Sequence, residues 1–169
     1  GQGVMYAEAS GELVELAELL QAPVMTTLLG KSSFPETHAL ALGSGSAVMS
    51  GPVYHFVGRS DVVFGIGCSF TKHGMVTNIP PGKVMIQATN DARDINKDYT
   101  VDYPILGDAE LVPSQFIEAV KDRLGEKGRS GNGTTAQEIK TVKDAWLREW
   151  MPKLTSDEVA MTPYRVIWE

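Results

Sequence analysis

The sequence predicts an α/β fold in which a parallel β-sheet carries helices on both of its faces. Short apolar runs typical of buried strands alternate with segments whose apolar residues recur at helical spacing. Turns rich in glycine, serine, asparagine and aspartate follow several of these runs. Such alternation is typical of parallel sheets, because a parallel connection must cross from one end of the sheet to the other. A chain of 169 residues is long enough for one such domain with a substantial core.

The first part of the chain predicts a turn, a helix and a strand. Gly1-Gln2-Gly3-Val4 is typical of the glycine turn that follows a strand, although no strand-forming run stands ahead of it. Apolar residues at i, i+3, i+4 and i+7 predict a helix over 10–20, which Pro23 stops. We expect a short strand over 24–27 and a turn over 28–32.

The middle of the chain supplies the other predicted strands. Residues 34–51 are rich in glycine, serine and proline and are expected to form a loop, followed by a short helix over about 52–58. Residues 62–67 are continuously apolar, which predicts a fully buried strand. Two further strands are predicted over 83–88 and 103–106, with a short helical stretch between them.

The last part of the chain predicts helices. A long helix with Pro113 in its first turn should end near 124. Residues 125–134 contain four glycines, which predicts a flexible linker, so residues 1–124 are expected to form the domain. Residues 135–169 should form a helical tail, in which Met151-Pro152 ends one helix. Thr162 and Pro163 then begin another helix that is cut off within two turns.

Composition and charge exclude several classes of protein. The net charge is −6 and the fifteen basic residues are scattered, which argues against binding to nucleic acid. No stretch approaches the roughly 20 apolar residues of a membrane helix, and no signal peptide opens the sequence. A single cysteine, Cys68, suits the reducing cytoplasm. It reads as a small residue packed at a strand end, with a reactive nucleophile as the alternative. His38, His55 and His73 lack partners at ligand spacing, so no metal site is predicted.

Residues 83–107 carry the strongest indication of a ligand site. Twice in this segment an apolar strand is followed by a turn with a capping residue, at Thr89-Asn90-Asp91 and at Gly107-Asp108. In parallel sheets, ligands bind outside the carboxyl ends of the strands. The segment therefore points to nucleotide-type binding.

A series of short motifs follows one another along residues 1–124. They are Gly1-Gln2-Gly3-Val4, Ala22-Pro23-Val24, Thr26-Thr27, Gly30-Lys31-Ser32 with Pro35 and His38, Ser60-Asp61-Val62-Val63, Gly65-Ile66-Gly67, Lys83-Val84-Met85-Ile86-Gln87 and Ile105-Leu106-Gly107-Asp108. Their order and spacing resemble the central domain of thiamine-diphosphate enzymes, above all acetolactate synthase and its relatives. Thr162-Pro163-Tyr164-Arg165-Val166 resembles the entry into the diphosphate-binding domain that follows.

The resemblance implies a Rossmann-like central domain, of the kind that binds NAD or FAD elsewhere, within a three-domain subunit. In that family one flanking domain binds the cofactor's pyrimidine and supplies an activating Glu. The other binds the diphosphate through Mg²⁺ with a Gly-Asp-Gly motif, whereas here Gly107-Asp108 is followed by Ala109. The resemblance thus implies thiamine diphosphate and Mg²⁺ in the parent enzyme, but no catalytic residue in this chain. The implied partners are the two flanking domains and further copies in a homo-oligomer.

In some relatives the central domain holds FAD or an ADP moiety. The resemblance carries that role onto a set of residues at the turns: Gly1, Gln2, Gly3, Thr26, Gly30, Lys31, Gly67, Ser69, Thr89, Asn90 and Asp91. Glycines there would let the backbone approach a phosphate closely, and an acidic residue would accept from a ribose hydroxyl.

Two departures from the family pattern argue against tight FAD or ADP binding. The FAD-binding relatives show Arg-Phe-Asp-Asp-Arg where this chain has residues 68–73, Cys-Ser-Phe-Thr-Lys-His, and Asp-x-Asp where it has Ala88-Thr89-Asn90. The leading hypothesis is therefore a structural linker and oligomerisation module that is not catalytic alone. The alternatives are a regulatory domain that binds FAD, ADP or CoA, and an independent small Rossmann-like enzyme.

Overall fold

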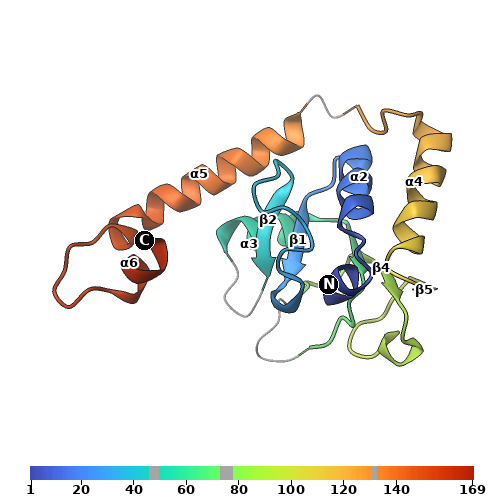
Figure 1. The fold of residues 1–169 in the computed structure, drawn as a ribbon, viewed down its shortest axis with the longest axis horizontal. Helices are drawn as coiled ribbons and strands as arrows, with labels where there is room; N and C mark the ends of the chain where they lie inside the picture. Colours follow the sequence, from blue (N-terminus) through green and yellow to red (C-terminus); the bar gives the residue numbers. More distant parts are fainter. Residues whose placement is uncertain (46–49, 73–77, 131–132) are drawn as a thin grey trace.

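The computed structural model describes residues 1–45, 50–72, 78–130 and 133–169 of the chain. Elements up to α4 form a compact body, from which α5 extends with α6 at its far end (Figure 1). The elements are α1 (Gln2–Tyr6), α2 (Ser10–Leu20), β1 (Val24–Thr27), the 3-10 turn η1 (Leu28–Gly30), β2 (Ala41–Gly45), α3 (Gly51–Arg59), β3 (Val62–Ile66), β4 (Val84–Thr89), the 3-10 turn η2 (Ala92–Asp94), β5 (Tyr103–Leu106), α4 (Leu111–Leu124), α5 (Thr134–Leu154) and α6 (Pro163–Trp168).

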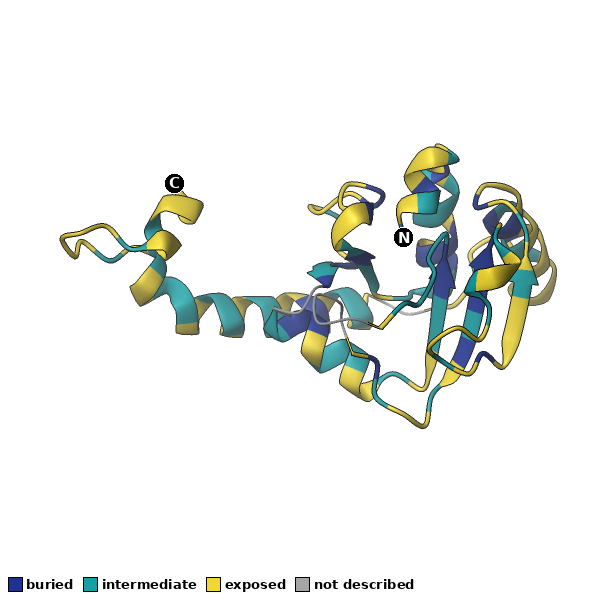
Figure 2. Ribbon diagram, turned by 90° about the horizontal axis from the view of Figure 1, so that it is seen from below, coloured by how far each residue is buried: buried dark blue, intermediate teal, exposed yellow. Residues whose placement is uncertain are grey.

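The strands of the described residues all pair in parallel, which confirms the predicted α/β class. Their hydrogen bonds form two sheets, one of β1 and β2 and one in the order β3-β4-β5. Val63 lies opposite Met85 in the register between β3 and β4, and Ala88 lies opposite Ile105 between β4 and β5. Helices lie above and below the strands (Figure 2).

The outer strand β5 carries a proline in its middle. Gly107 N donates to Thr89 O of the neighbouring strand at 2.9 Å. Because successive residues of a strand direct their backbone groups to opposite edges, the nitrogen of Pro104 lies on the edge away from β4. That nitrogen carries no hydrogen, so the outer edge of β5 lacks one donor.

Strand β2 lies within residues 34–51, where the sequence predicted a loop, so that prediction was wrong for Ala41–Gly45. Its glycines hid it from pattern reasoning, whereas its stabilisation comes from pairing with β1 and from the buried side chains of Leu40 and Leu42. Strand β3 was predicted to be fully buried. Val62 is instead 45% exposed, and burial increases along the strand toward Ile66, which is 6% exposed.

The predicted helices form, with two differences in detail. Helix α1 begins at Gln2, inside the predicted glycine turn. Helix α5 continues through Pro152 to Leu154, although Met151-Pro152 was predicted to end it. The proline stands in the last turn of the helix, where it removes one i→i−4 hydrogen bond close to the helix end. The turn is still closed, because Thr155 N donates to Met151 O at 3.0 Å. Thr162 caps α6 as predicted, since its Oγ1 accepts from Arg165 N at 3.3 Å.

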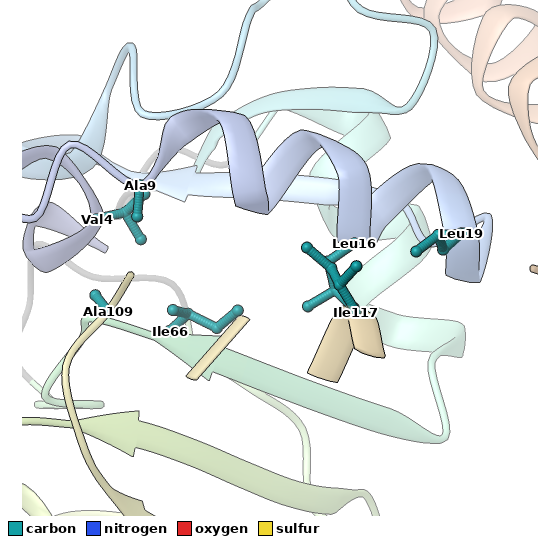
Figure 3. Close-up of a cluster of buried hydrophobic side chains, with 7 residues drawn as sticks. All are labelled: Val4, Ala9, Leu16, Leu19, Ile66, Ala109 and Ile117. Atoms are coloured by element: carbon teal, nitrogen blue, oxygen red, sulfur yellow. The ribbon is translucent and has the colours of Figure 1, made fainter. Parts of the chain in front are cut away.

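The core consists of two clusters of buried side chains that meet at α2. The first joins α1, α2, β3 and α4 (Figure 3): Val4, Ala9, Leu16, Leu19, Ile66, Ala109 and Ile117. The second joins α2, β2, α3 and α5: Ala17, Phe34, Leu40, Ala41, Leu42, Val53 and Ile139. Helix α2 therefore ties the two sheets into one body.

The segment that leads from α4 to α5 touches the body. Arg129 N donates to Leu19 O at 2.7 Å, and a Cβ on Gly128 would lie 2.2 Å from that same oxygen. This part of the predicted linker 125–134 is therefore packed on the end of α2. Residues 131–132 of the linker lie outside the described residues.

Helix α5 is held to the body by Glu138 and Ile139 near its start and by Trp146 further along. Ile139, which is 1% exposed, inserts into the second core cluster. Glu138 beside it bonds to Arg59 Nη1 at 3.2 Å and to His55 Nε2 at 3.4 Å. Further along, a Cβ on Gly51 would lie 2.4 Å from the Trp146 ring, so α3 and α5 approach closely there.

Replacing Ile139 with alanine tests this attachment. Deleting most of a buried isoleucine side chain leaves a cavity, so I139A should lower the free energy of unfolding by about 2–4 kcal/mol. Thr141→Ala, at an exposed position of the same helix, is the matched control and should change it by less than about 0.5 kcal/mol. Denaturant unfolding measures both. Equal midpoints for the two variants would show that α5 is not held through Ile139.

Candidate functional site

The carboxyl ends of β1, β3 and β4 surround one cavity of about 1200 Å³. The turns that follow these strands line the end of the cavity at the carboxyl edge of the sheets, as expected for a parallel sheet. The structure brings together on this cavity seven of the predicted site residues: Gly1, Gln2, Gly3, Gly67, Ser69, Thr89 and Asn90.

Three glycines form the floor of this end of the cavity by backbone contact. Gly3 N donates to Gly67 O at 2.9 Å, and the nitrogen of Gly1 donates to Ile66 O at 2.7 Å. Gly67 has a φ of +59°, and a Cβ on it would lie 2.7 Å from the nitrogen of Val4. Only glycine therefore fits at position 67, because it tolerates a positive φ and has no Cβ.

The predicted residues Thr26, Gly30 and Lys31, on β1 and at η1, do not line the cavity. Gly30 lies against the glycine floor, since a Cβ on it would be 2.8 Å from the carbonyl carbon of Gly1. Its N–H donates to Thr27 Oγ1 at 3.1 Å, which caps η1. Thr26 is buried and its hydroxyl bonds to Ser44 Oγ on β2 at 3.0 Å. Lys31 is exposed and pairs with Glu36.

Asp91 stands outside the cavity lining and has a local partner. Its Oδ1 accepts from Arg93 N at 3.0 Å and caps η2, and its Oδ2 accepts from Arg93 Nη2 at 2.6 Å. These hydrogen bonds to Arg93 lower the pKa of Asp91 to about 2. The carboxylate predicted to accept from a ribose hydroxyl is thus already occupied by a guanidinium.

The turn after β3 is internally bonded as well. Ser69 Oγ and Thr71 Oγ1 lie 2.8 Å apart. Burial raises the pKa of the Cys68 thiol above its ordinary value, since burial disfavours the thiolate. A thiol that stays protonated is a poor nucleophile, which supports the interpretation of Cys68 as a packed residue.

Two residues at this edge were not singled out from the sequence. Ser33 lines the cavity, is 1% exposed, and its Oγ has no hydrogen-bond partner in the described part of the chain. Gln87 is fully buried, and its Nε2 donates to Cys68 O at 3.1 Å and to Asp94 O at 3.3 Å. Gln87 is the one polar residue in the otherwise apolar run 84–88. A polar residue at such a position could have been identified from the sequence as a buried hydrogen-bonding group.

The described residues do not supply a set of ligands for Mg²⁺. No three His, Cys, Asp or Glu side chains gather in the ranges that the structure describes. Asp108, which follows Gly107, accepts from Glu110 N at 2.8 Å and so caps the turn before α4. His38 lies 3.2 Å from Glu18 Oε1, and His73 lies outside the described residues. The residues present therefore do not fit the metal site of a diphosphate-binding domain.

Of the helices within the described ranges, none combines the length and the apolar character needed to cross a bilayer.

A parallel α/β domain with a glycine-lined carboxyl edge belongs to the broad class of nucleotide-binding-type folds. Comparison with known families is more specific, because residues 1–119 match the family described as thiamine pyrophosphate enzyme, central domain. The chain therefore belongs to the family of thiamine-diphosphate enzyme central domains.

The curated relatives are much longer than this chain. It is 31% identical to the probable acetolactate synthase large subunit of Methanococcus aeolicus, over 100% of this chain and 29% of that protein. It is 32% identical to the protein of the same description from Methanocaldococcus jannaschii, over 99% of this chain and 27% of that protein. The acetolactate synthase of Mycobacterium avium is 33% identical over 72% of this chain and 20% of its own length. The chain thus spans less than a third of these relatives.

Gly67→Ala tests the glycine floor. The added Cβ meets the Val4 nitrogen and the Gly3 backbone in a left-handed conformation, so we expect a loss of about 2–4 kcal/mol of stability. Gly82→Ala is the matched control, because Gly82 also has a positive φ (+84°) but nothing lies near its added Cβ. Denaturant unfolding of both variants separates the backbone strain from the overlap. Similar losses in the two would show that positions 1–4 yield easily.

The pairing of Asp91 with Arg93 predicts a pH dependence. By NMR titration the Asp91 carboxyl should have a midpoint of about 2, and Arg93→Gln should return it toward about 4. Because the folded-state pKa is the lower one, the pair stabilises the fold above about pH 4, and this contribution is lost as the pH falls toward 2.

Lys97→Gln is the control for this titration, since the charge of Lys97 is the weakest of the influences that lower the Asp91 pKa. An Asp91 midpoint that is the same in the Arg93→Gln variant and in the parent chain would exclude the ion pair as the cause.

Proposed function

We propose that this chain is the central domain of a thiamine-diphosphate- and Mg²⁺-dependent enzyme of the acetolactate synthase type, in which it serves as a structural linker. The observation that carries the proposal is the match of residues 1–119 to this family, within relatives at least three times as long. Thiamine diphosphate and Mg²⁺ would be bound by the flanking domains, because the described residues offer no cluster of metal ligands.

The proposal divides the chain into three parts. Residues 1–124 form the Rossmann-like domain, 125–134 connect, and 135–169 lead toward the diphosphate-binding domain. The C-terminal part supports this division, because Val166, Ile167 and Trp168 of α6 are exposed and would be covered by a following domain. We also propose that the domain supports assembly into a homo-oligomer in the cytoplasm.

A scaffold role agrees with the state of the carboxyl edge. Asp91 is held by Arg93, and Ser69 is bonded to Thr71, so two of the polar groups expected to bind a nucleotide already have partners within their own turns. The alternative, a regulatory domain for FAD, ADP or CoA, has one observation in its favour. This is the buried and unpartnered hydroxyl of Ser33 on the cavity wall, which a ligand oxygen could satisfy.

Turnover and thermal stability test the proposal on the chain itself. With pyruvate, thiamine diphosphate and Mg²⁺ the chain should form no acetolactate. Its melting temperature should be unchanged by thiamine diphosphate, FAD, ADP or CoA. A ligand present at about 100 times its Kd would add about 2.7 kcal/mol and raise the melting temperature by roughly 5–10 °C.

Turnover and each kind of melting-temperature shift would support a different function. Turnover, or a shift with thiamine diphosphate, would overturn the scaffold role. A shift with FAD, ADP or CoA would favour the regulatory alternative. In that case Ser33→Ala should abolish the shift, whereas Ser69→Ala serves as a control for an already bonded hydroxyl.

A further inference from the structure

We propose that the groove between α3 and α5 is a binding site for a small organic cation of the alkylammonium class. The groove has a volume of about 530 Å³, which lies within the range of ligand pockets in proteins. Tyr54, Trp146 and Glu149 line it and have no part in the cavity at the carboxyl edge. The inference therefore concerns a second site and does not depend on the proposed function.

The groove runs between two helices that lie antiparallel. At one end Gly51 of α3 faces α5, because a Cβ on Gly51 would lie 2.4 Å from Cδ1 of Trp146. At the other end Arg59 Nη1 donates to Glu138 Oε1 at 3.2 Å. Glu138 and Glu149 both belong to α5, and at 1.5 Å per residue their separation along the helix is about 16 Å. The two ends of the groove can therefore present different chemistry to a ligand.

The positive groups of the lining are already engaged at the Glu138 end. Arg59 pairs with Glu138, and His55 Nε2 lies 3.2 Å from Arg59 Nη1 and 3.4 Å from Glu138 Oε1. The Debye length at physiological salt is about 8 Å, so over about 16 Å this pair has little effect on the far end of the groove. The lining therefore does not favour an anion.

The far end of the groove is acidic and aromatic. Glu149 is exposed and has no ion pair among the described residues. Trp146 precedes it by one helical turn, so the two side chains are neighbours on one face of α5. Tyr54 of α3 also lines the groove and is 69% exposed. Because aromatic rings attract cations to their faces and a carboxylate adds a full negative charge, this end favours a cation.

Helix α5 shows the same chemistry one turn further on. Lys153 Nζ lies 4.5 Å from the centre of the Trp150 ring and 5.9 Å from that of the Tyr164 ring. The ring of Trp146 lies 6.0 Å from that of Trp150, and no cation stands over it within the described ranges. A cation bound in the groove would use Trp146 as Lys153 uses Trp150.

The remaining walls define the kind of cation. Apolar side chains complete the lining of the groove: Val57, Pro80, Val142 and Ala145. Such walls cannot replace the water shell of an inorganic ion, so they disfavour Na⁺ or K⁺. They do suit the methyl or methylene groups of an alkylammonium ion, whose apolar surface gains from leaving water.

Binding of choline tests the proposal on the chain as it stands. In NMR spectra, choline should shift the indole N–H signal of Trp146 in a saturable manner. The uncharged molecule of nearly the same shape, 3,3-dimethylbutan-1-ol, should bind at least about fivefold more weakly. Raising the NaCl concentration from about 50 to about 500 mM should weaken the binding of choline and not that of the alcohol. Benzoate is the anionic probe and should cause no shift.

Two exposed side chains of the groove can be changed without touching the core. Glu149→Gln removes the charge and Tyr54→Leu removes one ring, and each should weaken choline binding at least about fivefold. Glu118→Gln, at an exposed position of α4, is the matched control and should leave binding unchanged.

Four outcomes would overturn the proposal. They are the absence of a saturable shift with choline, equal binding of choline and the alcohol, tighter binding of benzoate than of choline, and unchanged choline binding in the Glu149→Gln variant. The comparison of the three probes uses the parent chain, so it remains decisive even if a variant fails to fold.

Discussion

The backbone contact between the first residues of the chain and Gly67 is the constraint on which the rest of the body depends. It brings α1 onto the end of β3, so that Val4 enters the same core cluster as Ile66. The chain then turns directly into α2, with Ala9 N donating to Val4 O at 2.9 Å. Because α2 contributes to both core clusters, the position of this one contact determines how the two sheets are held.

The same contact limits what the carboxyl edge can do chemically. Glycine at three positions gives a floor without side chains, which suits a phosphate or a close-packed backbone equally well. The neighbouring polar groups decide between these uses. The Asp91 carboxylate and the Ser69 hydroxyl are already bonded within their own turns, whereas the buried hydroxyl of Ser33 on the cavity wall has no partner among the described residues.

The sequence predicted those parts of the fold that depend on local patterns. Helix α2 follows from its apolar spacing, and α6 follows from Thr162 and Pro163. β2 was missed because its Leu-Gly-Ser-Gly run has no strand pattern. The strand is stabilised by pairing with β1, as between Thr27 and Gly45, which lie far apart in the sequence. At the site, the sequence predicted that glycines at the turns allow close approach of the backbone. The capture of Asp91 by Arg93 could not, since a solvated arginine has the same sequence signature.

The proline in β5 has a consequence for how copies of the protein can assemble. Many oligomers extend a sheet across the boundary between subunits by pairing two outer strands. Here the outer edge of β5 lacks the donor at Pro104, so a ladder continued across that boundary would be interrupted at its centre. Any copies that met at this side would therefore contact each other more readily through side chains than through a continued sheet. Such contacts can diverge between homologues without disturbing the sheet.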